Sequence, residues 1–199
     1  IGSYAFNACS GLSSLTLGSR ITTIESYAFY NCSGLTGVTI PASVISIQAR
    51  AFDACSGLSA ISVAAENPAY ASVEGVLFNR AATALIQFPR GRSGAYEMPE
   101  GVLSVEDYAF QGCTGLTEVA FSESLTTIGN YAFTGCTGLT SIVLPDSVST
   151  IGSYAFANCT GLTSLVLGIA VNTIGSYAFS GCIGLTSVVI PDSVVSIDT

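Results

Sequence analysis

The sequence predicts a β-rich solenoid, in which a coil of about 23 residues repeats along the chain. One observation behind this prediction is the motif Ala-Phe-x-x-Cys, whose successive copies lie 23 residues apart with a single exception. Another is that apolar residues keep the same positions between successive motifs, which is typical of repeat architectures. The motif places phenylalanine at Phe6, Phe29, Phe52, Phe110, Phe133, Phe156 and Phe179.

The coils are phased on the residue that follows each Cys-x-Gly. They then begin at residues 12, 35, 58, 116, 139, 162 and 185, and an eighth coil is placed at residue 93. The exceptional spacing resolves into a long coil over 58–92 and a coil from Ser93, which keeps the apolar pattern without the leading Leu. A coil alone buries too little to offset the entropy of ordering it, so the coils must stack. We expect residues 1–199 to be a single solenoid fragment of a longer protein.

The first element of each coil is predicted to be a short strand, as the coil that begins at Leu139 illustrates. Ile142 and Leu144 follow the two-residue period of a strand, so both point inward and their neighbours point outward. Pro145 ends the strand, because proline has no N–H for a ladder. Equivalent strands of successive coils are expected to pair in parallel.

The rest of the coil is predicted to hold a second extended piece and a turn. The β-branched residues of 148–151 favour the extended piece. Residues 153–159, which include Tyr154 and Phe156, are too few for a stable helix and favour a helical turn. Gly138 and its equivalents close each coil, where the backbone angles suit glycine.

The long coil carries 12 extra residues and three of the five arginines, Arg80, Arg90 and Arg92. The apolar runs 76–78 and 85–88 predict a hairpin, which we expect to protrude from the stack and add little to the core. No acidic residue lies between Gly75 and Tyr96. The arginines therefore serve either to keep a protruding hairpin soluble or to form a local cationic surface for an acidic ligand.

The phrases LTSVVIPDSVVSI and IGSYAFSGC resemble the BspA-like class of leucine-rich repeat, found in surface proteins of host-associated bacteria and parasitic protists. The resemblance covers essentially the whole chain. The long coil, with ENPAYASVEGVLFNRAATALIQFPRG, resembles the extended repeat of this family. The resemblance implies a leucine-rich-repeat solenoid in a secreted or cell-surface protein with a role in adhesion or host-protein binding. No binding residue is implied by it.

The composition excludes most catalytic chemistry. With no His and no Lys, the chain offers no Ser-His couple and no Schiff-base lysine, and we expect a protein without enzymatic activity, cofactor or metal. The formal charge of -8 would repel a phosphate backbone, so no nucleic acid is expected. Apolar stretches such as 165–171 are far shorter than the ~18 residues of a spanning helix, so no membrane insertion is expected.

The cysteines share one repeat position, which permits three interpretations. Stacked coils about 4.8 Å apart suit the Cα separation of a disulfide, but the Cβ atoms would lie too far apart without distortion. A zinc site needs four clustered ligands, whereas these thiols form a line. Buried, unbridged thiols are therefore favoured. The residues are Cys9, Cys32, Cys55, Cys113, Cys136, Cys159 and Cys182.

Asn31 and Asn158 lie in glycosylation sequons, Asn-Cys-Ser and Asn-Cys-Thr. Elsewhere the same repeat position holds Ala or Gly, which favours a tight turn that tolerates a left-handed backbone. Whether these asparagines are glycosylated stays open.

The outward positions of the first strands are the candidate binding site. They are almost free of charge, and small hydroxyls beside exposed valines favour a contact surface for a protein ligand, such as a host surface or matrix protein. The β-propensity of Thr and Val explains the same residues without any function. A structural spacer and a flat glycan- or ice-binding face are the alternatives. The candidate residues are Ser141, Val143, Ser164, Val166, Ser187 and Val189, with Arg80, Arg90 and Arg92 as a secondary site.

Overall fold

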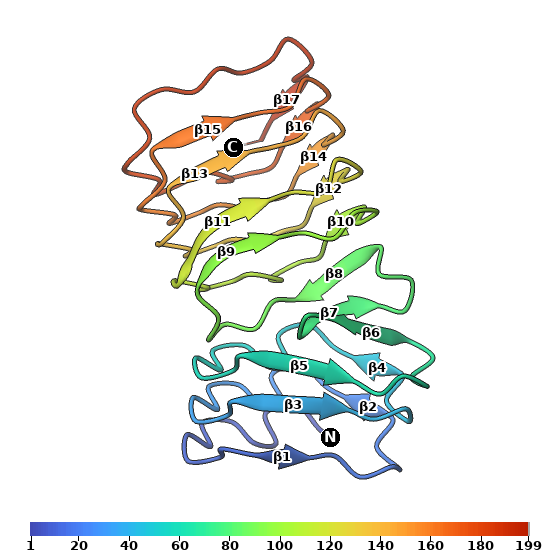
Figure 1. Ribbon diagram of the computed structural model, residues 1–199. Coiled ribbons are helices and arrows are strands. Elements are labelled where there is room, and N and C mark those ends of the chain that lie inside the picture. Colours follow the sequence, from blue (N-terminus) through green and yellow to red (C-terminus); the bar gives the residue numbers. More distant parts are fainter. Residues whose placement is uncertain (199) are drawn as a thin grey trace. The chain divides into compact units, whose positions relative to one another are not determined.

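The computed structural model describes residues 1–198 and builds them from short strands and turns, with no helix among them. The chain divides into two compact units, one over Ile1–Arg92 and one that starts at Ser93 (Figure 1). Each regular coil contributes a first strand and, after a turn, a second strand. The predicted leucine-rich-repeat solenoid of parallel strands is confirmed.

In the first unit, two parallel rows precede an antiparallel meander. The first row is β1 (Leu15–Thr16), β3 (Gly37–Ile40) and β5 (Ala60–Val63), and the second is β2 (Thr23–Ile24) and β4 (Ser46–Ile47). The meander is β6 (Tyr70–Val73), β7 (Val76–Asn79) and β8 (Ala84–Gln87). Val38 pairs with Ile61, one repeat of 23 residues further on.

The second unit repeats the two-row arrangement. Its first strands are β9 (Gly94–Glu97), β11 (Leu116–Ala120), β13 (Ser141–Val143) and β15 (Ser164–Val166). Its second strands are β10 (Ser104–Val105), β12 (Thr127–Ile128), β14 (Thr150–Ile151), β16 (Thr173–Ile174) and β17 (Ser196–Ile197). Ile128, Ile151 and Ile174 are partners in successive parallel pairs, so one inward side chain recurs at each level of the stack.

The core is a column of the motif phenylalanines. In the second unit the rings of Phe110, Phe133 and Phe156 are fully buried. Their centroids are 4.5 Å apart for the first pair and 5.0 Å apart for the second, and the rings are nearly parallel. Each ring therefore packs on the equivalent ring of the neighbouring coil, which is why a single coil has no complete core of its own.

The turn after the second strand is a series of tight turns and not the helical turn that we predicted. Its N–H groups alternate in direction. The N–H of Ala157 donates within its own coil to the carbonyl of Tyr154 at 3.1 Å, whereas the N–H of Phe156 donates to Ala178 of the next coil at 2.8 Å. Tyr154 has a left-handed backbone with a φ of 57°, which breaks any helical path. Half of these groups thus join neighbouring coils.

The repeat position of Asn31 and Asn158 has a left-handed backbone, so the predicted tight turn is confirmed. The φ angle is 58° at Asn158 and 73° at the equivalent Gly135. Small or backbone-bonding side chains suit this conformation best, which explains the choice of residues. The position is held by Ala8, Asn31, Ala54, Gly112, Gly135, Asn158 and Gly181. Both asparagines are exposed, and their glycosylation stays a hypothesis.

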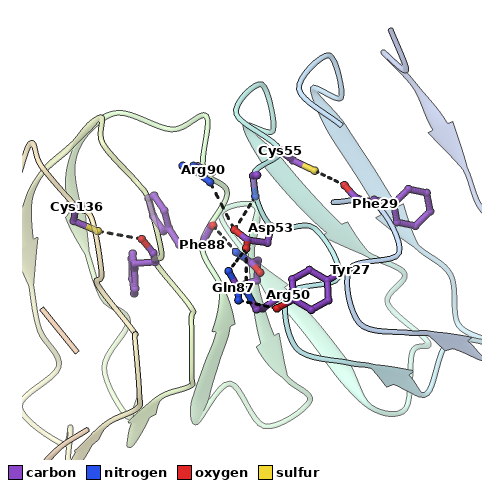
Figure 2. Close-up of polar contacts among 11 residues, drawn as sticks. Tyr27, Phe29, Arg50, Asp53, Cys55, Gln87, Phe88, Arg90 and Cys136 are labelled. Carbon is purple, nitrogen blue, oxygen red and sulfur yellow. Dashed lines mark hydrogen bonds and ion pairs between the residues drawn. The ribbon is translucent and has the colours of Figure 1, made fainter. Parts of the chain in front are cut away.

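The cysteine thiols are all unbridged, and six of the seven are buried. The thiol of Cys55 donates to the carbonyl of Phe29 at 3.0 Å, and that of Cys136 donates to Phe110 at 3.0 Å (Figure 2). Each such bond spans two neighbouring coils. The expectation that every thiol is buried is wrong for Cys9, which is exposed.

Thiol titration of the native protein is expected to count one fast thiol, Cys9, and six slow ones. Burial raises the pKa of Cys55 to about 12, so its reactive thiolate is scarce at neutral and mildly alkaline pH. Cys9→Ser should abolish the fast phase. Denaturation without reductant should then release all seven thiols of the unsubstituted chain. A total of five or fewer would reveal a disulfide.

The long coil is part of the core, so the expectation of a protruding hairpin is wrong. Its apolar runs do pair antiparallel as β7 and β8, but β6 also pairs with β7, so the insertion is a three-stranded meander. Val76, Leu77, Phe78 and Leu85 are fully buried. The extra residues therefore fold back over the first unit.

Among the described residues, the long coil adds no strand to the parallel row of β2 and β4. Polar side chains of the long coil instead bond to the preceding coil at that place. The amide of Asn67, fully buried, donates to the carbonyls of Pro41 at 2.8 Å and Val44 at 2.9 Å. The hydroxyl of Tyr70 accepts the N–H of Ile47 at 2.7 Å. These contacts satisfy backbone groups that the row would otherwise leave unpaired.

Candidate functional site

The structure places four of the six predicted outward residues side by side. β13 and β15 pair in parallel, with Ser141 opposite Ser164 and Val143 opposite Val166. Between these positions Ile142 and Leu165 point inward and are buried. The side chains of Val143 and Val166 remain 60% and 50% exposed. We call this surface, made of Ser141, Val143, Ser164 and Val166, the valine face.

Ser187 and Val189 do not continue the valine face as a strand. They lie within 185–190, which has no regular secondary structure, so no register fixes them beside β15. Val189 is nevertheless 83% exposed, the highest value among the three valines of this column. Only the part of the predicted stripe on β13 and β15 forms a defined surface.

An open groove of about 270 Å³ lies beside the valine face. Val143 and Ser141 of β13 line one part of it, and Glu118 of β11 lines another. Beyond the strands, Phe121, Glu123 and Pro145 complete its walls. Val143 was among the predicted outward residues, whereas Glu118, Glu123 and Pro145 join the groove through the pairing of the strands and the path of the chain after each strand.

The sequence reasoning missed a row of stacked tyrosines. In the second unit Tyr131 stacks on Tyr154 at 4.8 Å, and Tyr154 stacks on Tyr177 at 4.9 Å. Partial burial, with the neighbouring phenols, raises the pKa of Tyr154. The recurring Tyr-Ala-Phe was the available signal. Tyr131 and Tyr154 each have a tyrosine ring stacked on both faces, so the row contributes to packing between neighbouring coils.

The arginines of the predicted secondary site, Arg80, Arg90 and Arg92, make separate contacts. Asp53, nearly buried, holds Arg50 by an ion pair of 2.8 Å and Arg90 by one of 3.6 Å (Figure 2). Arg50 also donates to the hydroxyl of Tyr27 at 2.7 Å and lies over its ring. The charge of Arg90 is thus directed at a carboxylate of its own unit.

The other two predicted arginines contact backbone carbonyls. Arg80 donates to Ala65 at 3.1 Å, and Arg92 donates to Glu74 at 2.8 Å while lying over the ring of Phe88. The three arginines of the predicted secondary site thus contact different partners, Ala65, Asp53 and Glu74. Each of them ties part of the long coil to a neighbouring segment.

The described residues contain neither a metal-binding group nor a membrane-spanning helix. Within 1–198, no group of three or more His, Cys, Asp or Glu side chains is arranged to hold a metal ion. The same residues include no apolar helix with the length to span a bilayer. The arrangement offers two surface properties instead: exposed aliphatic side chains on flat strands, and carboxylates at the edge of a groove.

Comparisons with solved structures place the fold among bacterial leucine-rich repeat proteins. The pneumococcal vaccine antigen PcpA is 24% identical, with a TM-score of 0.69 over 88% of this chain and 47% of that chain. A leucine-rich cell surface protein from Faecalibacterium prausnitzii A2-165 is 31% identical, with a TM-score of 0.64 over 86% of this chain and 52% of that chain. The chain thus spans about half the length of these two proteins.

A leucine-rich repeat protein from Eubacterium ventriosum is 25% identical, with a TM-score of 0.55 over 89% of this chain and 60% of that chain. A search of curated proteins found no significant match. The family described as BspA type leucine rich repeat region matches in six copies, over residues 1–91 and 93–199. Because that match takes in nearly every residue, and because the coils stack as parallel rows, the chain belongs to the BspA-type leucine-rich repeat family.

Proposed function

We propose that this chain is a non-enzymatic interaction module of a secreted or cell-surface bacterial protein, and that it binds a protein partner through the valine face. One observation carries the proposal: Val143 and Val166 lie in register on adjacent strands and remain 60% and 50% exposed. Aligned aliphatic side chains on a flat sheet gain free energy when a partner removes them from water. The small side chains of Ser141 and Ser164 allow the partner to approach closely.

The family and the solved relatives support this proposal at a coarser level. One similar protein is described as a cell surface protein, and another as a vaccine antigen. Adhesion to a host surface or matrix protein suits such a location. Catalysis has little support, since the sequence has no His and no Lys to serve as base or nucleophile.

The test is a pull-down of host surface extracts on the immobilised chain, followed by affinity measurement with the captured partner. Val166→Lys would place a charge within the contact. We expect it to weaken binding more than tenfold, which corresponds to about 1.4 kcal/mol. The substituted residue is half exposed, so folding should be nearly unchanged.

Two control variants make the result specific. Thr39→Lys puts the same charge at the equivalent outward position of β3, where no valine stripe exists, and should leave binding unchanged. Arg92→Glu tests the secondary site. Full binding by Val166→Lys would discard the valine face, and loss of binding with Arg92→Glu alone would move the site to the long coil.

A further inference from the structure

We infer that the groove beside the valine face takes a basic segment of the partner, in which an arginine or lysine adjoins an aliphatic side chain. This inference rests on the proposed function and names the chemistry of the partner. It combines the charge distribution of the chain with the residues that line the groove.

The second unit is anionic without any cationic residue. The five arginines all lie at or before Arg92, and no Lys, Arg or His follows it. The acidic residues that do follow are Glu97, Glu100, Glu106, Asp107, Glu118, Glu123, Asp146, Asp192 and Asp198. Residues 93–199 therefore have a formal charge of -9, against +1 for residues 1–92. A basic partner is drawn to the second unit, whereas an acidic one is repelled.

Within this unit, the groove joins charge to apolar surface. Glu118 lies on β11, and Glu123 lies in the turn that follows it; both are exposed. Val143, Phe121 and Pro145 supply apolar walls of the same groove. No side chain of the unit neutralises either carboxylate, because the unit has no cation.

This lining suits a peptide better than a metal ion or a membrane. Among the described residues, no third acidic, His or Cys side chain completes a metal-binding group with Glu118 and Glu123. An anionic lipid surface would be repelled by the charge of the unit. A guanidinium or ammonium group satisfies a carboxylate, and a neighbouring aliphatic side chain covers Val143.

The test uses fluorescent peptides of Gly and Ser with a central Arg-Val-Arg, measured by anisotropy against the intact chain. We expect saturable binding that weakens as salt is raised. Glu118→Gln and Glu123→Gln should each raise Kd about threefold to fivefold, the effect expected of one exposed ion pair. Glu100→Gln is the matched control, since it removes the same charge from the same unit but lies outside the groove lining.

Specific outcomes would overturn the inference. An equal loss with Glu100→Gln would show attraction to the unit as a whole and not to the groove. If an Arg-Gly-Arg peptide bound as tightly as the Arg-Val-Arg peptide, the proposed contact of the aliphatic side chain would be rejected. Absence of saturable binding would reject the site itself. A calcium-dependent rise in Tm that both groove variants abolish would assign the carboxylates to a metal.

The captured partner separates this inference from the proposed function. Binding that is lost in Val166→Lys but unchanged in a Glu118→Gln/Glu123→Gln double variant would keep the valine face and reject the basic segment. Binding that is unaffected by Val166→Lys would reject the valine face, whatever the peptides do.

Discussion

Replacement of Phe133 by alanine is expected to lower the free energy of unfolding by about 3 to 5 kcal/mol, the usual cost of emptying a buried aromatic site. The ring is fully buried between Phe110 at 4.5 Å and Phe156 at 5.0 Å, and Phe121 meets its edge at 5.8 Å. Both neighbouring coils lose a packing surface at once. Urea denaturation followed by far-ultraviolet circular dichroism measures the change.

Phe179→Ala is the matched control for this prediction. Phe179 belongs to the same column but is only partly buried, and within the described residues it stacks on Phe156 alone, at 5.4 Å. Its removal should therefore cost less than that of Phe133. Equal costs would mean that stability does not depend on contact with both neighbouring coils.

Phe78→Ala, in the long coil, is expected to destabilise the first unit by a similar amount, about 3 to 5 kcal/mol. Phe78 is fully buried on β7, where it faces Ala71 on one side and Leu85 on the other. The same denaturation experiment measures the loss. Arg80→Ala, at the exposed tip after β7, should change stability by no more than about 0.5 kcal/mol. A cost of less than about 1 kcal/mol for Phe78→Ala would contradict the placement of the meander in the core.

The sequence was sufficient for features that depend on local backbone and on the repeat. The two-residue period around Ile142 predicted which side chains are buried, and β13 confirms it. Restriction of one position to Asn, Ala and Gly predicted the left-handed turn at Asn158. In both cases the same structural constraint acts on the equivalent position of each coil, so the repeated residue types reveal it in the sequence.

The turn around Tyr154 shows why local reasoning failed elsewhere. A short apolar turn that is isolated from other segments favours a helical conformation. Here, however, the next coil places carbonyl groups within hydrogen-bond distance of the N–H groups of the turn. The N–H of Tyr154 accordingly donates to Ser176 of the next coil at 2.9 Å. Bonds of this kind outweigh the local preference, and a tyrosine, which ordinarily avoids left-handed angles, adopts a φ of 57°.

The predictions for the long coil and for its arginines were limited for a related reason. Arg90 pairs with Asp53, a residue of an earlier coil, and no spacing in the sequence announces that contact. The absence of acids between Gly75 and Tyr96 suggested unpaired charge, but the carboxylate that pairs with Arg90 lies outside that stretch of the sequence. For the candidate site, β13 and β15 were predictable, but the groove required the paths of the chain after β11 and β13.

The alternating N–H pattern of the turns also has an evolutionary consequence. Since each coil donates to the next through main-chain groups, a duplicated coil can enter the stack without new side-chain chemistry at its borders. Gene duplication of whole repeats then lengthens or shortens the protein while the register of every other coil survives. Exposed positions such as that of Val166 are left to diversify coil by coil, so the surface can change while the framework stays the same.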